Sequence, residues 1–144
     1  MSLGHGWRGL SLIVALAAAA EEPAYTVIVN AANPVSEMKK GQVAALFLDR
    51  RARWAETAAA PVDQSARSGL REVFSRDVLG QPVVAVVNHW RQRMGSAVDR
   101  QMPPPVKVSD EEVIAYVAKE KGGIGYVSSA ALLPATVKAL RLRD

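Results

Sequence analysis

The sequence contains no cysteine, which excludes disulfide bonds, thiolate metal sites and a cysteine nucleophile. It contains two histidines, His5 and His89. His89 has no second histidine or carboxylate at the spacing of a metal site or a catalytic pair. No two carboxylates lie in a convincing catalytic setting either. We therefore predict that the protein is not an enzyme and that it holds no catalytic residue, metal ion or cofactor.

The chain also has only a small excess of positive over negative charge. Lys and Arg number 18 against 14 Asp and Glu, which gives a net charge of +4. This small excess gives little reason to expect nucleic acid as a partner. Apolar residues, by contrast, make up 49% of the chain against 22% charged residues, which is typical of a globular protein. The 144 residues are enough for one domain with its own hydrophobic core.

One long apolar run is present, at residues 10–20. Arg8 precedes the run, and three alanines at its end precede Glu21, as at a signal-peptide cleavage site. The run is shorter than the roughly 20 residues that a membrane-spanning helix needs. We predict a secretory signal at residues 1–20 and an exported, soluble domain at residues 21–144. The alternatives are an N-terminal core helix and an uncleaved anchor.

The rest of the chain alternates between strand patterns and helix patterns. Strands are predicted at residues 25–30, 60–62, 124–128 and, as one edge strand of alternating apolar and basic residues, 137–143. Helices are predicted after a cap at Ser36, at residues 70–79, at residues 83–93 behind Pro82, and after a capping box formed by Ser109 and Glu112. A later start is the alternative for the first of these helices, because Gly41 weakens its beginning. This alternation predicts a single α/β lobe, a mostly parallel sheet flanked by helices.

Two details of this pattern can be checked in a structure. The helix at residues 70–79 is predicted from the helical spacing of the apolar residues Leu70, Val73, Phe74, Val78 and Leu79. A glycine within the strand at residues 124–128, Gly125, predicts that another part of the chain approaches closely there.

Residues 63–74 place a Ser- and Gly-rich segment between a predicted strand and a predicted helix. The first amide groups of a helix have no partner within it, and together with the helix dipole they attract anions. Ser68 can cap the helix or turn its hydroxyl toward an oxyanion, and Gly69 lets the backbone approach a ligand. Arg67 and Arg71 add positive charge nearby. The simpler interpretation is an ordinary N-cap at Ser68 and an ordinary turn residue at Gly69, and the residues of this stretch alone favour it.

A basic loop with one aromatic residue lies at residues 49–54. Its arginines can attract anions, or one of them can stack on Trp54. The alternative, which we favour, is a solvated turn with Trp54 folded over the core.

Four segments, taken together and in order, resemble one protein family. They are residues 27–35 (VIVNAANPV), residues 46–50 with Trp54, residues 67–74 (RSGLREVF) and residues 122–128 (GGIGYVS). The ordered set resembles the phosphate-binding proteins of phosphate ABC transporters, a branch of the periplasmic binding protein superfamily. The similarity extends over nearly all of residues 21–144. It implies a periplasmic-binding-protein-like lobe and a location in the periplasm.

In the full-length family, two α/β lobes close over phosphate, and a Ser-Gly-Thr segment at a helix start in the second lobe donates hydrogen bonds to it. Ser68 and Gly69 match the first two positions, whereas Leu70 stands where threonine is usual. An arginine four residues before the serine often pairs with the phosphate. Gln64 stands at that position, and it can donate a hydrogen bond but carries no charge. The present chain resembles the second lobe only.

The resemblance implies a set of candidate ligand-binding residues: Gln64, Arg67, Ser68, Gly69, Leu70, Arg71 and Asn33. The first functional hypothesis is an exported solute-binding protein that binds phosphate or a related oxyanion, in the service of an ABC transporter. The second is a ligand-free protein–protein interaction module that docks on a membrane sensor, a transporter or a second copy of itself, through Trp54, Trp90 and the basic loop. Nucleic acid is not expected as a partner.

Overall fold

The computed structural model describes residue 4, residues 23–54 and residues 56–144. Its elements are β1 (Tyr25–Asn30), β2 (Glu37–Lys39), α1 (Lys40–Leu48), β3 (Arg53–Trp54), β4 (Thr57–Ala58), β5 (Ala60–Pro61), β6 (Asp63–Gln64), α2 (Gly69–Phe74), the π-helical turn η1 (Ser75–Leu79), α3 (Val83–Met94), β7 (Val106–Lys107), α4 (Asp110–Lys119), β8 (Gly123–Ser128), β9 (Val137–Ala139) and β10 (Arg141–Arg143). The predicted secretory signal at residues 1–20 lies outside the described residues, apart from Gly4.

The central sheet has four strands in the order β5-β8-β1-β9. β1 is antiparallel to both β8 and β9, whereas β5 is parallel to β8. Three separate strand pairs accompany this sheet: β10 is parallel to β2, β6 is parallel to β7, and β3 is antiparallel to β4. The α/β class is therefore confirmed, and the parallel character of the sheet is confirmed in part.

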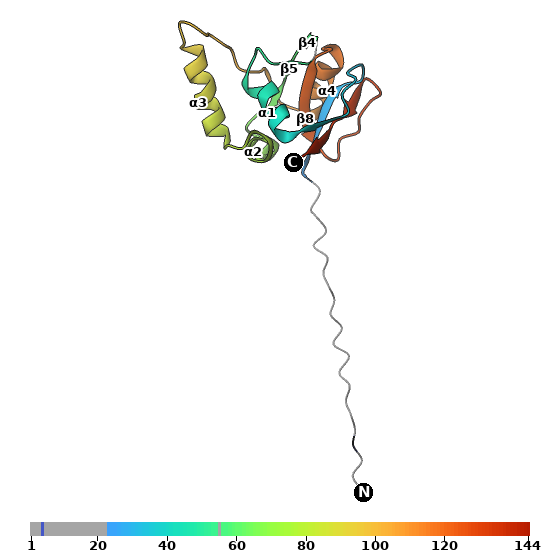
Figure 1. Ribbon diagram of the computed structural model, residues 1–144. Helices are drawn as coiled ribbons and strands as arrows, with labels where there is room; N and C mark the ends of the chain where they lie inside the picture. Colours follow the sequence, from blue (N-terminus) through green and yellow to red (C-terminus); the bar gives the residue numbers. More distant parts are fainter. Residues whose placement is uncertain (1–3, 5–22, 55) are drawn as a thin grey trace.

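The residues of β1 explain why the sheet is covered on both faces. Val27 and Val29 belong to one hydrophobic cluster and Ile28 to another, because successive side chains of a strand point to opposite faces. The first cluster contains core residues of α1 and α2, and the second contains those of α4. The sheet is thus the middle layer between these helices, while α3 lies outside α2, away from the sheet (Figure 1).

Two glycines, Gly122 just before β8 and Gly125 within it, permit close packing. A Cβ on Gly122 would lie 1.9 Å from the carbonyl oxygen of Ala58. A Cβ on Gly125 would lie 2.7 Å from methyl carbons of both Val62 and Val113. The close approach predicted at Gly125 is therefore confirmed, and it allows α4 to pack directly on β8.

Several local predictions are confirmed. α3 begins at Val83, directly after Pro82, and Ser109 caps α4 by accepting a hydrogen bond from the Glu112 amide at 3.2 Å. Trp54 is buried, and its indole N–H donates to the carbonyl oxygen of Gly122 at 2.9 Å. The interpretation of Trp54 as a cover over the core is therefore the correct one.

Two predictions about the N-terminal and C-terminal segments are wrong. The cap at Ser36 is not formed, and the alternative of a later start is confirmed: residues 37–39 form β2, and α1 begins at Lys40. The predicted single strand at residues 137–143 is divided at Leu140 into β9 and β10. Both differences have one cause, since β10 pairs with β2 while β9 pairs with β1, and this long-range pairing is not encoded in local sequence preferences.

One apolar residue of the helical segment at residues 69–79 lies outside the core. Val73 is 43% exposed, whereas Phe74 and Val78 are buried and Leu70 packs against the first cluster. The inward stripe of this helix therefore runs in steps of four residues, from Leu70 through Phe74 to Val78. A π-helical turn has more residues per turn than an α-helix, so the turn at η1 is consistent with this wider spacing.

Candidate functional site

The candidate site lies where β6 ends and α2 begins. β6 is held by β7, and the amide of Ser65, just after β6, donates to the carbonyl oxygen of Lys107 at 2.8 Å. Ser65 then forms a tight turn: its carbonyl accepts the Ser68 amide at 3.1 Å, and its hydroxyl accepts the Arg67 amide at 3.3 Å. This turn places Ser68 at the start of the helix.

Ser68 is the N-cap residue of α2. Its backbone is extended (φ −84°, ψ 123°), and its Oγ accepts a hydrogen bond from the Leu70 amide at 3.2 Å. Its carbonyl accepts the Arg71 amide, also at 3.2 Å. The helical backbone continues from α2 into η1, so one helical segment runs from Gly69 to Leu79. The interpretation of Ser68 as an N-cap is confirmed.

The amide groups at this helix start are mostly occupied by the chain itself. The amides of Ser68, Leu70 and Arg71 all donate to the two serines of the turn. Within the part of the chain that the structure describes, the Gly69 amide makes no hydrogen bond, and Gly69 is exposed. The helix start therefore presents one free backbone donor to solvent instead of a full set.

Gln64 is buried beneath this turn, and its polar atoms are engaged. Its Nε2 donates to Asp110 Oδ1 at 2.8 Å and to the carbonyl oxygen of Tyr126 at 2.9 Å. Its Oε1 accepts a longer bond from the hydroxyl of Ser68 at 3.4 Å. Because both hydrogens of the side-chain amide are used within the protein, Gln64 supports the turn and has none left for a ligand in this conformation.

A buried carboxylate lies next to Gln64. Asp63 Oδ1 accepts a hydrogen bond from the Tyr126 hydroxyl at 2.8 Å, and Arg71 Nη2 lies 3.9 Å from Asp63 Oδ2. Burial raises the pKa of Asp63 above its ordinary value, and the charge of Arg71 and the Tyr126 bond oppose this only in part. Burial, followed by the charge of Asp63, likewise raises the pKa of Tyr126. Tyr126 is therefore a neutral hydrogen-bond donor, and the charge of Arg71 is shared with Asp63.

Asp63, Asp110 and Tyr126 were not among the predicted site residues. The carboxylate of Asp63, directly after an apolar strand, was a usable signal, since buried carboxylates need partners. Asp110 and Tyr126 gave no such signal, because they come from α4 and β8, far along the sequence. Asp110 Oδ1 also accepts the Ser128 amide at 3.2 Å, so it connects the site to β8.

Two of the remaining predicted residues lie at the turn, and one does not. Arg67 is exposed, and no ion pair joins it to any described residue. Leu70 directs its side chain toward the core and offers only its backbone. Asn33 follows β1, near the Gly123 end of β8, because β1 and β8 are antiparallel. Gln64 binds Tyr126, three residues further along β8, so the structure does not bring Asn33 to the other candidates.

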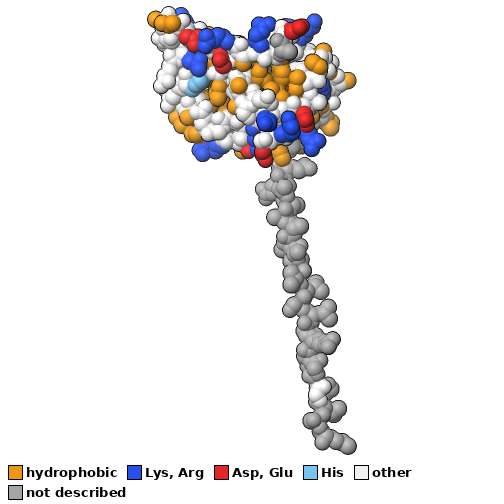
Figure 2. All heavy atoms as spheres, in the orientation of Figure 1, with side chains coloured by type: hydrophobic (Ala, Val, Ile, Leu, Met, Phe, Trp, Pro, Cys, Tyr) orange, Lys and Arg blue, Asp and Glu red, His pale blue; other side chains and the backbone are white. Residues whose placement is uncertain are grey.

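On the face shown in Figure 2, the positive side chains do not form one continuous surface. Figure 2 shows Lys and Arg in several separate groups on this face, some with Asp or Glu beside them. In the basic loop, for example, Arg51 pairs with Asp99 at 3.2 Å and lies 3.7 Å from Asp49. At the candidate site itself, Arg67 is the exposed arginine, whereas Arg71 lies near Asp63.

No protein-family model matches the sequence, and the search of curated proteins found no match. Solved structures do match. They include a protein from Clostridium perfringens that is described as a phosphate ABC transporter substrate-binding protein and was solved with bound phosphate (TM-score 0.59, 17% identity, 83% of this chain and 44% of that one). A phosphate transport receptor from Vibrio cholerae gives a TM-score of 0.60 at 20% identity, over 84% of this chain and 47% of that one. PstS from Borrelia burgdorferi gives a TM-score of 0.60 at 14% sequence identity, over 84% of this chain and 47% of that one.

These similarities establish the fold. The resemblance to phosphate-binding proteins, predicted from four short segments, is confirmed in three dimensions, and the neighbours are binding proteins. The chain spans less than half the length of each neighbour.

Two further observations concern the described part of the chain only. No helix there is long and apolar enough to cross a membrane. No group of three or more His, Asp or Glu side chains is arranged there to hold a metal ion.

Proposed function

We propose that residues 21–144 form an exported, periplasmic solute-binding protein that binds phosphate or a related inorganic oxyanion at the start of α2. The observation that carries the proposal is the group of donors available there: the free amide of exposed Gly69, the hydroxyl of Ser68 and the exposed guanidinium of Arg67. The fold of the chain, shared with a protein solved with bound phosphate, adds support.

The three groups have complementary roles toward an oxyanion. The Gly69 amide points out of the helix start, where the dipole favours negative charge. The Ser68 hydroxyl donates only a long hydrogen bond, 3.4 Å, to Gln64 Oε1. Turning its proton toward a ligand therefore breaks only a weak hydrogen bond. Its oxygen can meanwhile continue to accept the Leu70 amide. Arg67 supplies the charge, because Arg71 is already held near Asp63.

The site we propose is open to water. The matches cover less than half of each of these structures, and the described lobe by itself offers no second surface to close over a ligand. Water screens the interaction on the open side. We therefore expect a dissociation constant on the order of 1 mM, which corresponds to a binding free energy of about −4 kcal/mol. A transporter or another partner that supplied a second surface would make the binding tighter.

Calorimetry of the purified domain with phosphate, sulfate and molybdate tests the proposal. We expect heat with at least one of them, and a decrease in affinity of about three- to tenfold in Arg67→Gln. The matched control is Arg91→Gln, which removes the same charge from an exposed position on α3. An absence of heat with all three anions at several millimolar, or equal losses in the two variants, would reject this site.

A second candidate function is protein docking without a small ligand. The specific observation in its favour is that Gln64, at the position that aligns with the family's arginine, has its amide hydrogens bound within the protein. Purification of the tagged domain from membranes, followed by identification of co-purifying proteins, tests it. Recovery of a sensor or transporter, together with no heat in the anion titrations, favours docking. Recovery of the domain alone, together with measurable anion binding, counts against docking.

A further inference from the structure

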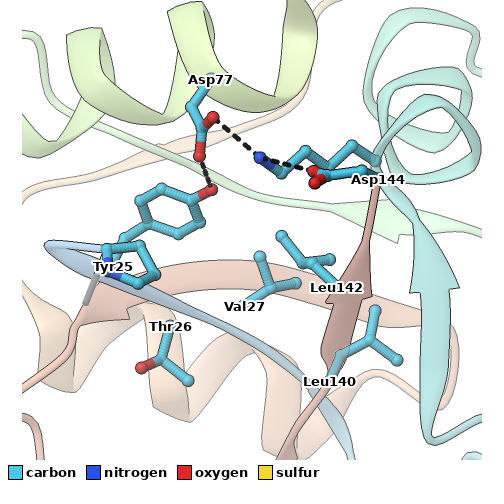
Figure 3. A pocket seen from close by; sticks show the side chains of 9 residues that line it. Tyr25, Thr26, Val27, Asp77, Leu140, Leu142 and Asp144 are labelled. Carbon is cyan, nitrogen blue, oxygen red and sulfur yellow. Dashed lines mark hydrogen bonds and ion pairs between the residues drawn. The ribbon is translucent and has the colours of Figure 1, made fainter. Parts of the chain in front are cut away.

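A second polar region, separate from the start of α2, lines a pocket of about 540 Å³ beside the first strand. Its floor is apolar and consists of Val27, Leu140 and Leu142. Its rim carries four polar side chains from four parts of the chain: Tyr25 of β1, Lys40 of α1, Asp77 of η1 and Asp144 after β10. Figure 3 labels Tyr25, Asp77 and Asp144 among them.

The rim residues form a chain of interactions. The Tyr25 hydroxyl donates to Asp77 Oδ2, and Lys40 Nζ lies 2.9 Å from Asp77 Oδ1. The same Nζ lies 3.3 Å from Asp144 Oδ1 (Figure 3). One ammonium group is therefore shared between two carboxylates, and neither carboxylate has Lys40 to itself.

The charge balance at this rim is negative. The hydrogen bond from Tyr25, then that from Lys40, lowers the pKa of Asp77, so this carboxylate is ionised at neutral pH. Burial, followed by the hydrogen bond to Asp77, raises the pKa of Tyr25 well above its usual range, so the phenol stays neutral. Two negative side chains thus surround one positive side chain, in a chain whose net charge is +4. Asp77 contributes more to this balance than Asp144, because the side chain of Asp144 is 97% exposed and water screens its charge.

We propose that this pocket binds a small organic cation with a short alkyl chain, either a primary ammonium or a guanidinium. The cationic group would lie at the rim against Asp77 and Asp144 and compete with Lys40 for them. The alkyl chain would cover Val27 and Leu140 on the floor. No residue of the candidate oxyanion site lines this pocket, so the proposal is independent of the proposed function.

The chemistry of the pocket favours this ligand class over two others. An anion of the same size would meet two carboxylates and only one ammonium, so it should bind less well than a cation. A neutral alcohol would gain only the apolar contact with the floor, which is a small area for a four-carbon chain. Charge, more than apolar area, should therefore determine which ligands bind.

Amide chemical-shift titrations test the ligand class. The probes are n-butylammonium and n-butylguanidinium, with n-butanol and n-butyrate as the neutral and anionic controls. We expect both cations to shift amides around Val27, Lys40 and Leu142 in a saturable manner, with weaker effects from butanol and none from butyrate. Equal effects from all four probes, or binding of butyrate alone, would overturn the proposal.

Two substitutions should change the affinity in opposite directions. Lys40→Gln removes the competing ammonium, so we expect the cations to bind about threefold more tightly. Asp77→Asn keeps the shape of the side chain and removes its charge, so we expect binding to weaken by about threefold. Asp99→Asn is the matched control, because Asp99 pairs with Arg51 and Arg93 and does not line the pocket.

The sign of the Lys40→Gln effect is the decisive result. A role for Lys40 as a ligand-binding cation predicts weaker binding in this variant, and a purely structural role predicts no change. Either result would reject the proposal. Circular dichroism of each variant shows whether it is folded, and Lys40→Gln still decides the question if Asp77→Asn fails to fold.

Discussion

The start of α2 and the pocket beside β1 differ in the sign of the ligand they are suited to hold. At the start of α2, most donors are bound within the chain, and an amide at Gly69 and a guanidinium at Arg67 remain. At the pocket, Asp77 and Asp144 outnumber Lys40. The net charge of a small protein thus does not decide which ions it attracts, because individual side chains set the local balance.

One aromatic cluster supports both regions. The ring of Phe74 stacks on Tyr126, with centroids 3.9 Å apart and planes 12° apart, and it meets the edge of Tyr25 at 5.6 Å. The hydroxyl of Tyr126 binds Asp63 beneath the start of α2, while the hydroxyl of Tyr25 binds Asp77 at the pocket. Four substitutions therefore test whether the two regions can be disturbed together or separately.

Phe74→Ala should have the largest effect, because it removes the ring that both regions share. Phe74 is fully buried, and such a truncation costs about 3–5 kcal/mol. We expect urea denaturation to show this loss, and both kinds of ligand to bind less well. Val84→Ala, at an exposed position on α3, is the control and should change stability by less than about 0.5 kcal/mol. A small loss in Phe74→Ala would show that the cluster does not join the regions.

Gly125→Ala should destabilise the protein by about 1–3 kcal/mol, because the new Cβ would collide with Val62 and Val113. These valines belong to the second cluster, on the face away from the pocket, so cation binding should persist in the folded fraction. Gly41→Ala is the matched control. A Cβ there meets nothing within 4 Å, and alanine in a helix should stabilise by up to about 1 kcal/mol. Equal effects at the two glycines would contradict the packing described for β8.

Ser68→Ala should cost about 1 kcal/mol, since it removes the N-cap of α2. Ser109→Ala removes the corresponding cap of α4 and should cost a similar amount. The two variants should differ in ligand binding, because only Ser68 lies at the proposed oxyanion site. Thermal denaturation and calorimetry with phosphate check both parts, and equal phosphate affinities in the two variants would argue for a purely structural serine.

Asp63→Asn should have the smallest effect at any single pH, because asparagine keeps the volume and can still accept from Tyr126. Burial raises the pKa of Asp63 in the folded protein above its ordinary value of 3.8. In the pH window between these two pKa values, the folded protein therefore binds more protons than the unfolded protein. The free energy of unfolding of the parent should therefore fall as pH rises through this window. The variant should lack this decrease, so its stability relative to the parent should increase from pH 4 to pH 7 in urea denaturation. Parallel curves would contradict the pKa direction.

The sequence was informative wherever the determinant is local. The N-caps at Ser68 and Ser109, the strand at residues 124–128 and the close packing at Gly125 all follow from residue type and spacing, and all are confirmed. The resemblance of four ordered segments also predicted the fold. These signals depend on neighbours in the chain, which a single sequence displays directly.

The sequence was uninformative where distant segments determine the outcome. The pairing of β2 with β10 replaced the predicted helix start at Ser36. The engagement of Gln64 depends on Asp110 and Tyr126, which lie 46 and 62 positions away. For the same reason the pocket was not predicted, since Tyr25, Asp77 and Asp144 come together only in the folded chain.

The most direct test of the proposed function is an amide-resolved titration of the isotope-labelled domain with phosphate. We predict that the Gly69 amide shifts progressively and saturably, together with those of Arg67 and Ser68, and that Arg67→Gln weakens this response whereas Arg91→Gln does not. If phosphate leaves the Gly69 amide unchanged while other amides shift, the anion binds elsewhere, and the start of α2 is a capped helix without a ligand.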